Sequence, residues 1–298
     1  MGMHQIPNKV DFYITNVCNL TCERCNRFNN FDFKGWQRWS DYEEAYTRWS
    51  QLVELRAITI MGGEPFLNPT LGDWIENLNR LFGIEIQVLT NGTRFKYAKD
   101  LYPKFLYRSP KTQAKNHIGV SLHNINDWPA MREDIMNFLE APVQEYTKDH
   151  PKNNWNSDWY FIDRNGIMVN VYISNNFGNA AIKVTEYNRF VLHNNDINLA
   201  HQNCAFVKWK SYHFIRGKLY KCGPVALMPE FDAQHNFDIS DEDRVLLNSY
   251  RALDPDNFEE YHKEFFANLD NPIPQCKFCP TTYDAITIYP VRKGKGFK

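Results

Sequence analysis

Seven cysteines, in two groups, are the residues of this 298-residue chain best suited to carry chemistry. The first group comprises Cys18, Cys22 and Cys25, with the spacing C-x3-C-x2-C. The second group comprises Cys204, Cys222, Cys276 and Cys279. An odd cysteine total argues against a framework of disulfides and favours metal or redox chemistry.

The first group has the spacing of an open metal site. Three thiolates can bind three irons of a four-iron cubane, which leaves the fourth iron without a protein ligand. An open coordination position is a feature of catalytic metal sites. The group follows a predicted strand, Asp11 to Thr15, so its cysteines should lie at the active-site edge of a barrel-like α/β fold. A zinc knuckle completed by a histidine is the alternative.

This segment resembles the hallmark of the radical S-adenosylmethionine (SAM) superfamily, C-x3-C-x2-C after the first strand of a partial barrel. The residues Gly62-Gly63-Glu64-Pro65 resemble the family's GGE motif. The resemblance implies that SAM chelates the open iron, that the glycines permit close approach and that Glu64 accepts from the amino group of SAM. Arg24 departs from the family, which usually has an aromatic residue there beside the adenine. A guanidinium can also stack on a ring.

Softer matches follow the later strands, at Thr90-Asn91-Gly92 and at Gly119 to His123. The resemblance implies that Ser121 touches the SAM ribose, that Thr90 lines the pocket and that Asn175 is a further cofactor-binding candidate. The alternative for Ser121 and His123 is an ordinary barrel residue. His123, at the end of a predicted strand, is the candidate catalytic proton acceptor if the substrate is an alcohol.

The second group can satisfy all four irons of another cubane. Cys204 and Cys222 bracket a predicted hairpin, and the pair Cys276 and Cys279 follows a predicted helical segment, Asp254 to Leu269. This order resembles the Twitch module, the shortened relative of the SPASM module. The resemblance implies an auxiliary [4Fe–4S] cluster that transfers electrons. A structural zinc site fits the same spacing.

Sequence periodicity predicts the elements that must position these residues. Strands are predicted at Asp11 to Thr15, Ala57 to Met61, Glu85 to Leu89, His117 to Leu122 and Met168 to Ile173, with a further candidate at Asp196 to Ala200. Helices are predicted after a capping box formed by Ser40 and Glu43, over Leu71 to Phe82 and over Trp128 to Leu139. Between Tyr146 and Gly166 we expect a long surface loop in preference to a lid.

These patterns predict an α/β protein. Residues 1–200 are expected to form a partial (β/α)6 TIM-like barrel, the radical SAM domain that the resemblance implies. Residues 201–298 are expected to form a smaller module, a β-hairpin around Gly217 followed by a helix, which by resemblance is a Twitch/SPASM-like module.

Charge and hydropathy limit the classes of partner and the cellular location that we expect. The formal net charge is −1, and no basic run is long enough to favour nucleic acid or an anionic membrane. The basic tail, Arg292 to Lys298, is interpreted as a solvated end. No segment approaches the roughly 18 consecutive apolar residues of a membrane span, and no apolar signal core precedes the first strand. We therefore expect a cytoplasmic protein.

The resemblance implies reductive cleavage of SAM to a 5′-deoxyadenosyl radical and oxidation or dehydrogenation of a small molecule or peptide. The expected electron donor is a flavodoxin or ferredoxin. Because the predicted barrel begins close to Met1, leaving no room for a leader-peptide domain, a small substrate is favoured. One alternative is a non-catalytic, zinc- or cluster-stabilised binding protein on the same scaffold. Another is a radical SAM scaffold that has lost turnover because of Arg24.

Overall fold

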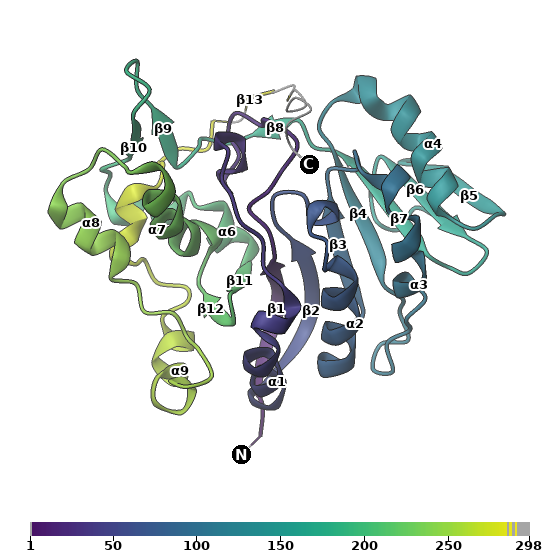
Figure 1. The fold of residues 1–298 in the computed structure, drawn as a ribbon, viewed down its shortest axis with the longest axis horizontal. Coiled ribbons are helices and arrows are strands. Elements are labelled where there is room, and N and C mark those ends of the chain that lie inside the picture. The colour runs from purple at the N-terminus through teal and green to yellow at the C-terminus, as the bar shows by residue number, and fades with distance from the viewer. Residues whose placement is uncertain (1, 285, 288–289, 291–298) are drawn as a thin grey trace.

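The computed structural model describes residues 2–284, 286–287 and 290. These residues build a nine-stranded sheet in the order β12-β11-β1-β2-β3-β4-β7-β6-β5 (Figure 1). The strands from β11 to β7 in this order run parallel to their neighbours, whereas β12, β6 and β5 pair antiparallel. The protein is therefore an α/β protein with a mostly parallel central sheet, as predicted. The ends of the described sheet, β12 and β5, do not pair with each other, so the barrel is not closed.

The sheet strands are β1 (His4–Tyr13), β2 (Val53–Met61), β3 (Ile86–Thr90), β4 (His117–Leu122), β5 (Val143–Thr147), β6 (Trp159–Asp163), β7 (Met168–Ile173), β11 (Tyr212–Ile215) and β12 (Lys218–Tyr220). Two short pairs lie apart from it: β8 (Asn176–Phe177) with β13 (Ile286–Thr287), and β9 (Ile182–Val184) with β10 (Phe190–Leu192). The helices are α1 (Glu43–Leu52), α2 (Leu71–Phe82), α3 (Tyr102–Phe105), α4 (Trp128–Phe138), α5 (Ile197–Gln202), α6 (Ala205–Trp209), α7 (Gly223–His235), α8 (Asp241–Asn248) and α9 (Phe258–Ala267).

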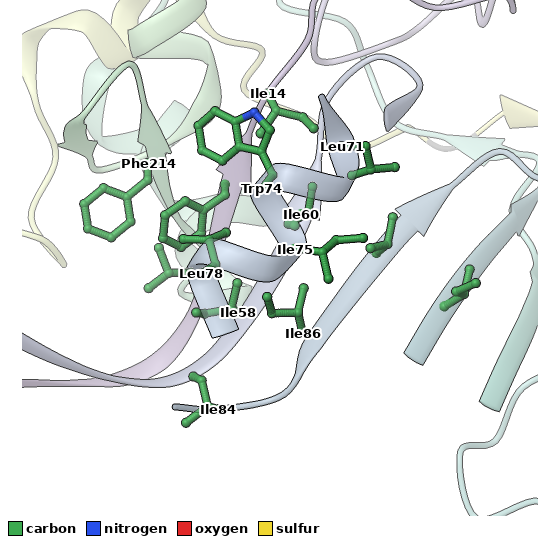
Figure 2. Packing of buried hydrophobic residues seen from close by; sticks show 14 of the residues in the cluster. Ile14, Ile58, Ile60, Leu71, Trp74, Ile75, Leu78, Ile84, Ile86 and Phe214 are labelled. Atoms are coloured by element: carbon green, nitrogen blue, oxygen red, sulfur yellow. The ribbon is translucent and has the colours of Figure 1, made fainter. Parts of the chain in front are cut away.

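Helix α2 shows how the connecting helices form the main core. Its apolar residues recur at helical spacing, so Trp74, Ile75 and Leu78 share one face and are buried. Figure 2 shows this face against sheet residues that include Ile60. The helix ends at Gly83, whose φ of +68° is the left-handed conformation that commonly terminates helices. The predicted helix over Leu71 to Phe82 is confirmed.

Several other predicted elements are confirmed. Strands β2, β3, β4 and β7 agree with prediction to within a few residues, and helix α4 ends one residue before the predicted Leu139. Helix α9 lies inside the predicted segment Asp254 to Leu269. The hairpin around Gly217 is β11–β12, and Gly217 adopts a φ of +74° at its turn. The hairpin continues the main sheet beside β1. The division of the chain at residue 200 remains a prediction.

Two predicted strand positions were wrong. Strand β1 begins at His4 and not at Asp11. The pairing of β1 with β2 shifts register between Ile6 and Lys9, where Pro7 lies. That irregularity and the polar residues around it hide the first half of the strand. The segment Asp196 to Ala200 is not a strand. Asp196 instead caps helix α5, its carboxylate accepting from the backbone N–H of Leu199 at 2.8 Å.

Two predictions about connections were also wrong. The segment Tyr146 to Gly166 is not a plain surface loop, since it contains β6 and the end of β5, which extend the sheet beyond β7. Ser40 and Glu43 do not form a capping box. Trp39–Asp41 forms a turn of 3-10 helix, and α1 begins at Glu43 without a side-chain cap. Glu43 still places a negative charge in the first turn, where the helix dipole favours it.

Within the described residues no helix combines the length and apolar character needed to cross a bilayer. The basic tail, Arg292 to Lys298, lies outside the described residues.

His213 of β11 is the most strongly perturbed histidine of the sheet. Burial, together with the nearby positive charge of Arg27, lowers its pKa from 6.5 to about 3. The Arg27 Nη2 lies 2.7 Å from His213 Nε2. Because a guanidinium only donates, Nε2 accepts this hydrogen bond and the ring is neutral.

This histidine predicts a loss of stability in mild acid. Between pH 6.5 and pH 3 the unfolded chain binds a proton that the folded chain excludes, so stability is full above about pH 6.5 and falls as the pH drops. From pH 7 to pH 5 the loss from His213 alone is about 2 kcal/mol. Urea unfolding at both pH values should show a smaller loss in His213→Gln, which retains an acceptor for Arg27. Equal losses in both proteins would contradict this assignment.

Candidate functional site

All seven cysteines line one cavity of about 350 Å³. Residues at or just beyond the carboxyl ends of the parallel strands form its wall, where side chains of successive strands meet. From β2, β3, β4 and β7 onward these are Met61, Gly62, Gly63, Leu89, Thr90, Asn91, Ser121, His123, Ser174 and Asn176. The sheet therefore brings the two cysteine groups, far apart in sequence, to the same edge.

The loop that carries the first cysteine group follows β1 and packs on the end of β2. The N–H of Gly63 donates to Thr15 O at 2.7 Å, and the N–H of Glu64 donates to Val17 O at 2.8 Å. A Cβ at position 63 would lie 2.3 Å from Val17 O and 3.0 Å from Cys18 Cβ. Only glycine permits this approach, so Gly63 holds Cys18 in place whatever it does toward a cofactor.

Glu64 links the end of β2 to the end of β3 through hydrogen bonds. Its buried carboxylate accepts from the Phe66 N–H at 3.0 Å, the Thr90 hydroxyl at 2.6 Å and the Asn91 N–H at 2.7 Å. Burial raises its pKa, and these hydrogen bonds oppose the rise. Glu64 is not among the residues that line the cavity. Its predicted contact with the amino group of SAM stays a prediction.

Asn91 is a site residue that the sequence analysis named within a motif without giving it a role. Its Nδ2 lies 3.8 Å from Cys18 Sγ and donates to Asn19 Oδ1 at 3.0 Å. At the third cysteine the direction is reversed, because the Cys25 thiol donates to Asn29 Oδ1 at 3.7 Å. Amides beside metal-binding thiolates orient them and adjust their basicity.

The other predicted cofactor-binding residues lie as follows. Thr90 is buried and faces Glu64, and both Thr90 and Ser121 line the cavity. Asn175 does not line the cavity, whereas its neighbours Ser174 and Asn176 do. The assignment of Asn175 therefore has no support from this geometry.

His123 lies in the cavity wall with one ring nitrogen engaged. Its Nδ1 is 2.5 Å from Ser174 O. A carbonyl oxygen only accepts, so Nδ1 carries the proton and Nε2 keeps its lone pair. Burial lowers the pKa of His123 and the hydrogen bond to Ser174 opposes this, so the ring is neutral near pH 7. A neutral imidazole in this wall can accept a proton.

Arg24 contributes to the cavity wall but does not extend freely into it. Its Nη1 donates to Asn179 Oδ1 at 2.9 Å and to Asp284 O at 2.8 Å. Asn179 in turn donates to Thr282 Oγ1 at 2.9 Å. The residue that departs from the family pattern therefore ties the first cysteine loop to the segment that follows Cys279.

The four C-terminal cysteines lie at the ends of short elements. Cys204 precedes α6, Cys222 precedes α7, and Cys276 and Cys279 lie in and just after a short 3-10 helix, Pro274–Phe278. Burial raises the pKa of Cys222 to about 12, and Cys204 and Cys276 add to the rise. Burial also raises the pKa of Cys279, with additions from the other three thiols. All four cysteines line the same cavity.

A buried lysine accompanies these thiols. Lys221 is 6% exposed, lines the cavity and donates to Asn271 O. Burial lowers its pKa, whereas Cys276, Cys222 and Cys204 act to raise it. Among the described residues no carboxylate lies within 4.0 Å of its Nζ. These three thiols and Asp270 are the groups that favour its charged form.

The donor sets fit iron–sulfur clusters in ligand type and number: three thiols with open space beside them, and four thiols together. The described residues contain no group of three or more His, Cys, Asp or Glu side chains arranged around a single metal ion. The fit therefore rests on the cysteines that share the cavity and on the buried positive charge beside them.

The fold and the site together define an α/β protein that presents cysteine ligands at the carboxyl edge of a parallel sheet. Residues 12–146, less than half of the chain, match the family model of the radical SAM superfamily. This part of the chain is similar to radical SAM superfamily domains. No curated protein matches the sequence.

Three solved structures are similar to part of this chain. Streptococcus suis SuiB bound to S-adenosylmethionine is 18% identical, with a TM-score of 0.33 over 42% of this chain and 27% of SuiB. SuiB bound to the precursor peptide SuiA is 16% identical, with a TM-score of 0.36 over 45% of this chain and 30% of that one. Native anSMEcpe, with bound AdoMet and a Cp18Cys peptide, is 19% identical, with a TM-score of 0.31 over 45% and 40%. The chain thus spans less than half the length of these structures.

Proposed function

We propose that this protein is a radical SAM enzyme that cleaves SAM reductively and removes a hydrogen atom from a small molecule or peptide. One observation carries the proposal. Cys18, Cys22 and Cys25 share a cavity with Gly62, Gly63, Thr90 and Ser121, at the ends of neighbouring parallel strands. The family match over residues 12–146 supports the same conclusion.

The chain's own residues would divide the work as follows. Cys18, Cys22 and Cys25 would hold a [4Fe–4S] cluster with one open iron for SAM. When bound, the cluster and SAM supply an electron and a 5′-deoxyadenosyl radical. Gly62 and Gly63, which have no side chains, allow the cysteine loop to pack directly against the end of β2. The cavity walls exclude water and oxygen from the radical.

We also propose that Cys204, Cys222, Cys276 and Cys279 hold a second [4Fe–4S] cluster, in a Twitch/SPASM-like module within residues 201–298. Four thiolates around a 2+ cluster give a net charge of about −2, which would balance buried positive charge such as that of Lys221. With no open iron, this cluster would accept electrons and not bind substrate.

The proposed reaction is a two-electron oxidation. His123 Nε2 would take a proton from the substrate, while the SAM-derived radical and a cluster held by the C-terminal cysteines would supply the acceptors for the hydrogen atom and the remaining electron. A flavodoxin or ferredoxin, the electron donor we expect in the cytoplasm, would supply the electron that cleaves SAM. His123 suits its role because its Nδ1 is engaged by Ser174 O and its pKa is lowered, which leaves the base unprotonated at neutral pH.

Metal analysis tests this proposal. The protein, purified without oxygen and reconstituted with iron and sulfide, should bind about eight irons per chain. The combined variant Cys18→Ala/Cys22→Ala/Cys25→Ala should bind about four. A colourless protein that holds zinc at both sites would overturn the enzyme and leave a zinc-stabilised binding protein. Clusters without 5′-deoxyadenosine formation under reducing conditions would indicate a scaffold that has lost turnover.

A further inference from the structure

Arg27 joins the first cysteine loop to the C-terminal cysteines. It lies two residues after Cys25 in sequence, yet its side chain is buried, at 6% exposure, among residues of the C-terminal part. The guanidinium carbon lies 4.8 Å from the centre of the Phe206 ring, and Nη2 lies 2.7 Å from His213 Nε2. Phe206 follows Cys204 by two residues, and His213 lies on the hairpin between Cys204 and Cys222.

The guanidinium also packs directly on the chain beside Cys222. A Cβ added to Gly223 would lie 3.2 Å from Cζ, Nε and Nη1 of Arg27. Gly223 is the first residue of α7 and follows Cys222. The absence of a side chain at Gly223 therefore lets the positive charge approach the backbone next to a cysteine.

The charge of Arg27 has no carboxylate to balance it directly. Among the described residues no carboxylate oxygen lies within 4.0 Å of its nitrogens, and its buried Nε has no hydrogen-bond partner. Its neighbours are neutral: His213, the Met61 sulfur at 3.5 Å from Nη2, and Asn26 Oδ1 at 3.1 Å from Nη1. Asp11 lies on the far side of His213 from Arg27, with its Oδ2 3.5 Å from His213 Nε2. A buried charge without such a partner needs an anion close by.

We propose that Arg27 supplies a fixed positive charge that raises the reduction potential of the C-terminal centre and so makes it the acceptor of the substrate's electron. The inference rests on the proposed second cluster. Reduction adds negative charge to a cluster, and a cation held in a poorly solvated region stabilises that reduced form. Arg27 does not line the cavity, so it acts through its field and is a positioning residue, not a catalytic one.

The test is a redox titration of reconstituted full-length protein, followed by electron paramagnetic resonance. The C-terminal centre is the signal that added SAM does not alter. In Arg27→Gln, the ratio of reduced to oxidised C-terminal centre at a fixed potential should fall about tenfold, equal to about 59 mV for a one-electron couple. Arg27→Lys keeps the charge and should stay within about threefold of wild type.

Arg132→Gln is the matched control, because the guanidinium of Arg132 pairs with Glu145 of β5, at the opposite end of the sheet from the β11–β12 hairpin. It should leave the potential of the C-terminal centre unchanged. An unchanged ratio in Arg27→Gln, with two clusters present, would overturn the role of Arg27 alone. An equal fall in Arg27→Lys and Arg27→Gln would do the same, since packing and not charge would then be responsible. About four irons and one zinc in the wild-type protein would overturn the second cluster itself, together with this inference.

Discussion

Alanine at position 63 is expected to lower 5′-deoxyadenosine formation on the order of 100-fold. A Cβ there would lie 2.3 Å from Val17 O, far inside contact distance, and 3.0 Å from Cys18 Cβ. The obstacle is backbone, so the cysteine loop must move away from β2 and lose its hydrogen bonds from Gly63 and Glu64. A displacement of about 1 Å at a reacting centre costs on the order of 100-fold in rate.

Gly72→Ala is the control for this substitution. Gly72 lies in the first turn of α2, where an added Cβ would make ordinary contacts of 3.5 Å with Leu101 and 3.7 Å with Lys104. Alanine favours a helix by about 1 kcal/mol over glycine, so this variant should retain full activity. Product assays and iron content, measured together, separate the outcomes. Wild-type turnover and iron content in Gly63→Ala would mean that the loop need not pack on β2.

Replacing Trp74 by alanine should destabilise the protein by about 3–5 kcal/mol. The indole is fully buried in α2, its ring centre lies 5.1 Å from that of Trp39, and its Nε1 donates to Gln37 O at 3.1 Å. Figure 2 shows it over the sheet. The substitution leaves a large cavity and removes one of the two hydrogen bonds that Gln37 O accepts, so the midpoint of thermal unfolding should fall by about 10 °C.

Val245→Ala provides the comparison, since Val245 is 71% exposed on α8. Its unfolding free energy should stay within about 0.5 kcal/mol of wild type. Urea unfolding of both apo variants measures the difference without any dependence on cluster content. A loss below about 1 kcal/mol in Trp74→Ala would show that the interface between α2 and the sheet is much less tightly packed than the structure indicates.

Elements with a strong apolar period were predictable, and elements fixed by neighbours were not. The face of α2 repeats at 3.6 residues, so sequence alone defines it. The short segment Asp196 to Ala200 has no such repeat, and its Asp196 cap was the signal that was missed. Strand β6 could not be recognised, because its pairing depends on β7 and on the antiparallel return of β5.

The same division holds for the site. Cysteine spacing and the glycines after β2 are enough to predict that Cys18 and Gly63 lie together, because the motif is local to two strand ends. Residue spacing does not predict that the Glu64 carboxylate accepts three hydrogen bonds from this chain. Nor does it predict that the Asn91 amide contacts Cys18. The position of Arg27 is equally hidden, since its neighbours are far away in sequence.

The parallel pairing of β11 with β1 joins segments that neighbour the two cysteine groups in sequence. Val10 pairs with Tyr212 and Phe12 with Phe214, so the strand before the first cysteine loop and the hairpin between Cys204 and Cys222 are adjacent rungs of one ladder. Strand spacing in a ladder is about 4.8 Å and hardly varies. The ladder therefore keeps the strand before the first cysteine group next to the hairpin that lies between Cys204 and Cys222. The β9–β10 hairpin is not part of this ladder, so an insertion there leaves the adjacency of the two segments unchanged.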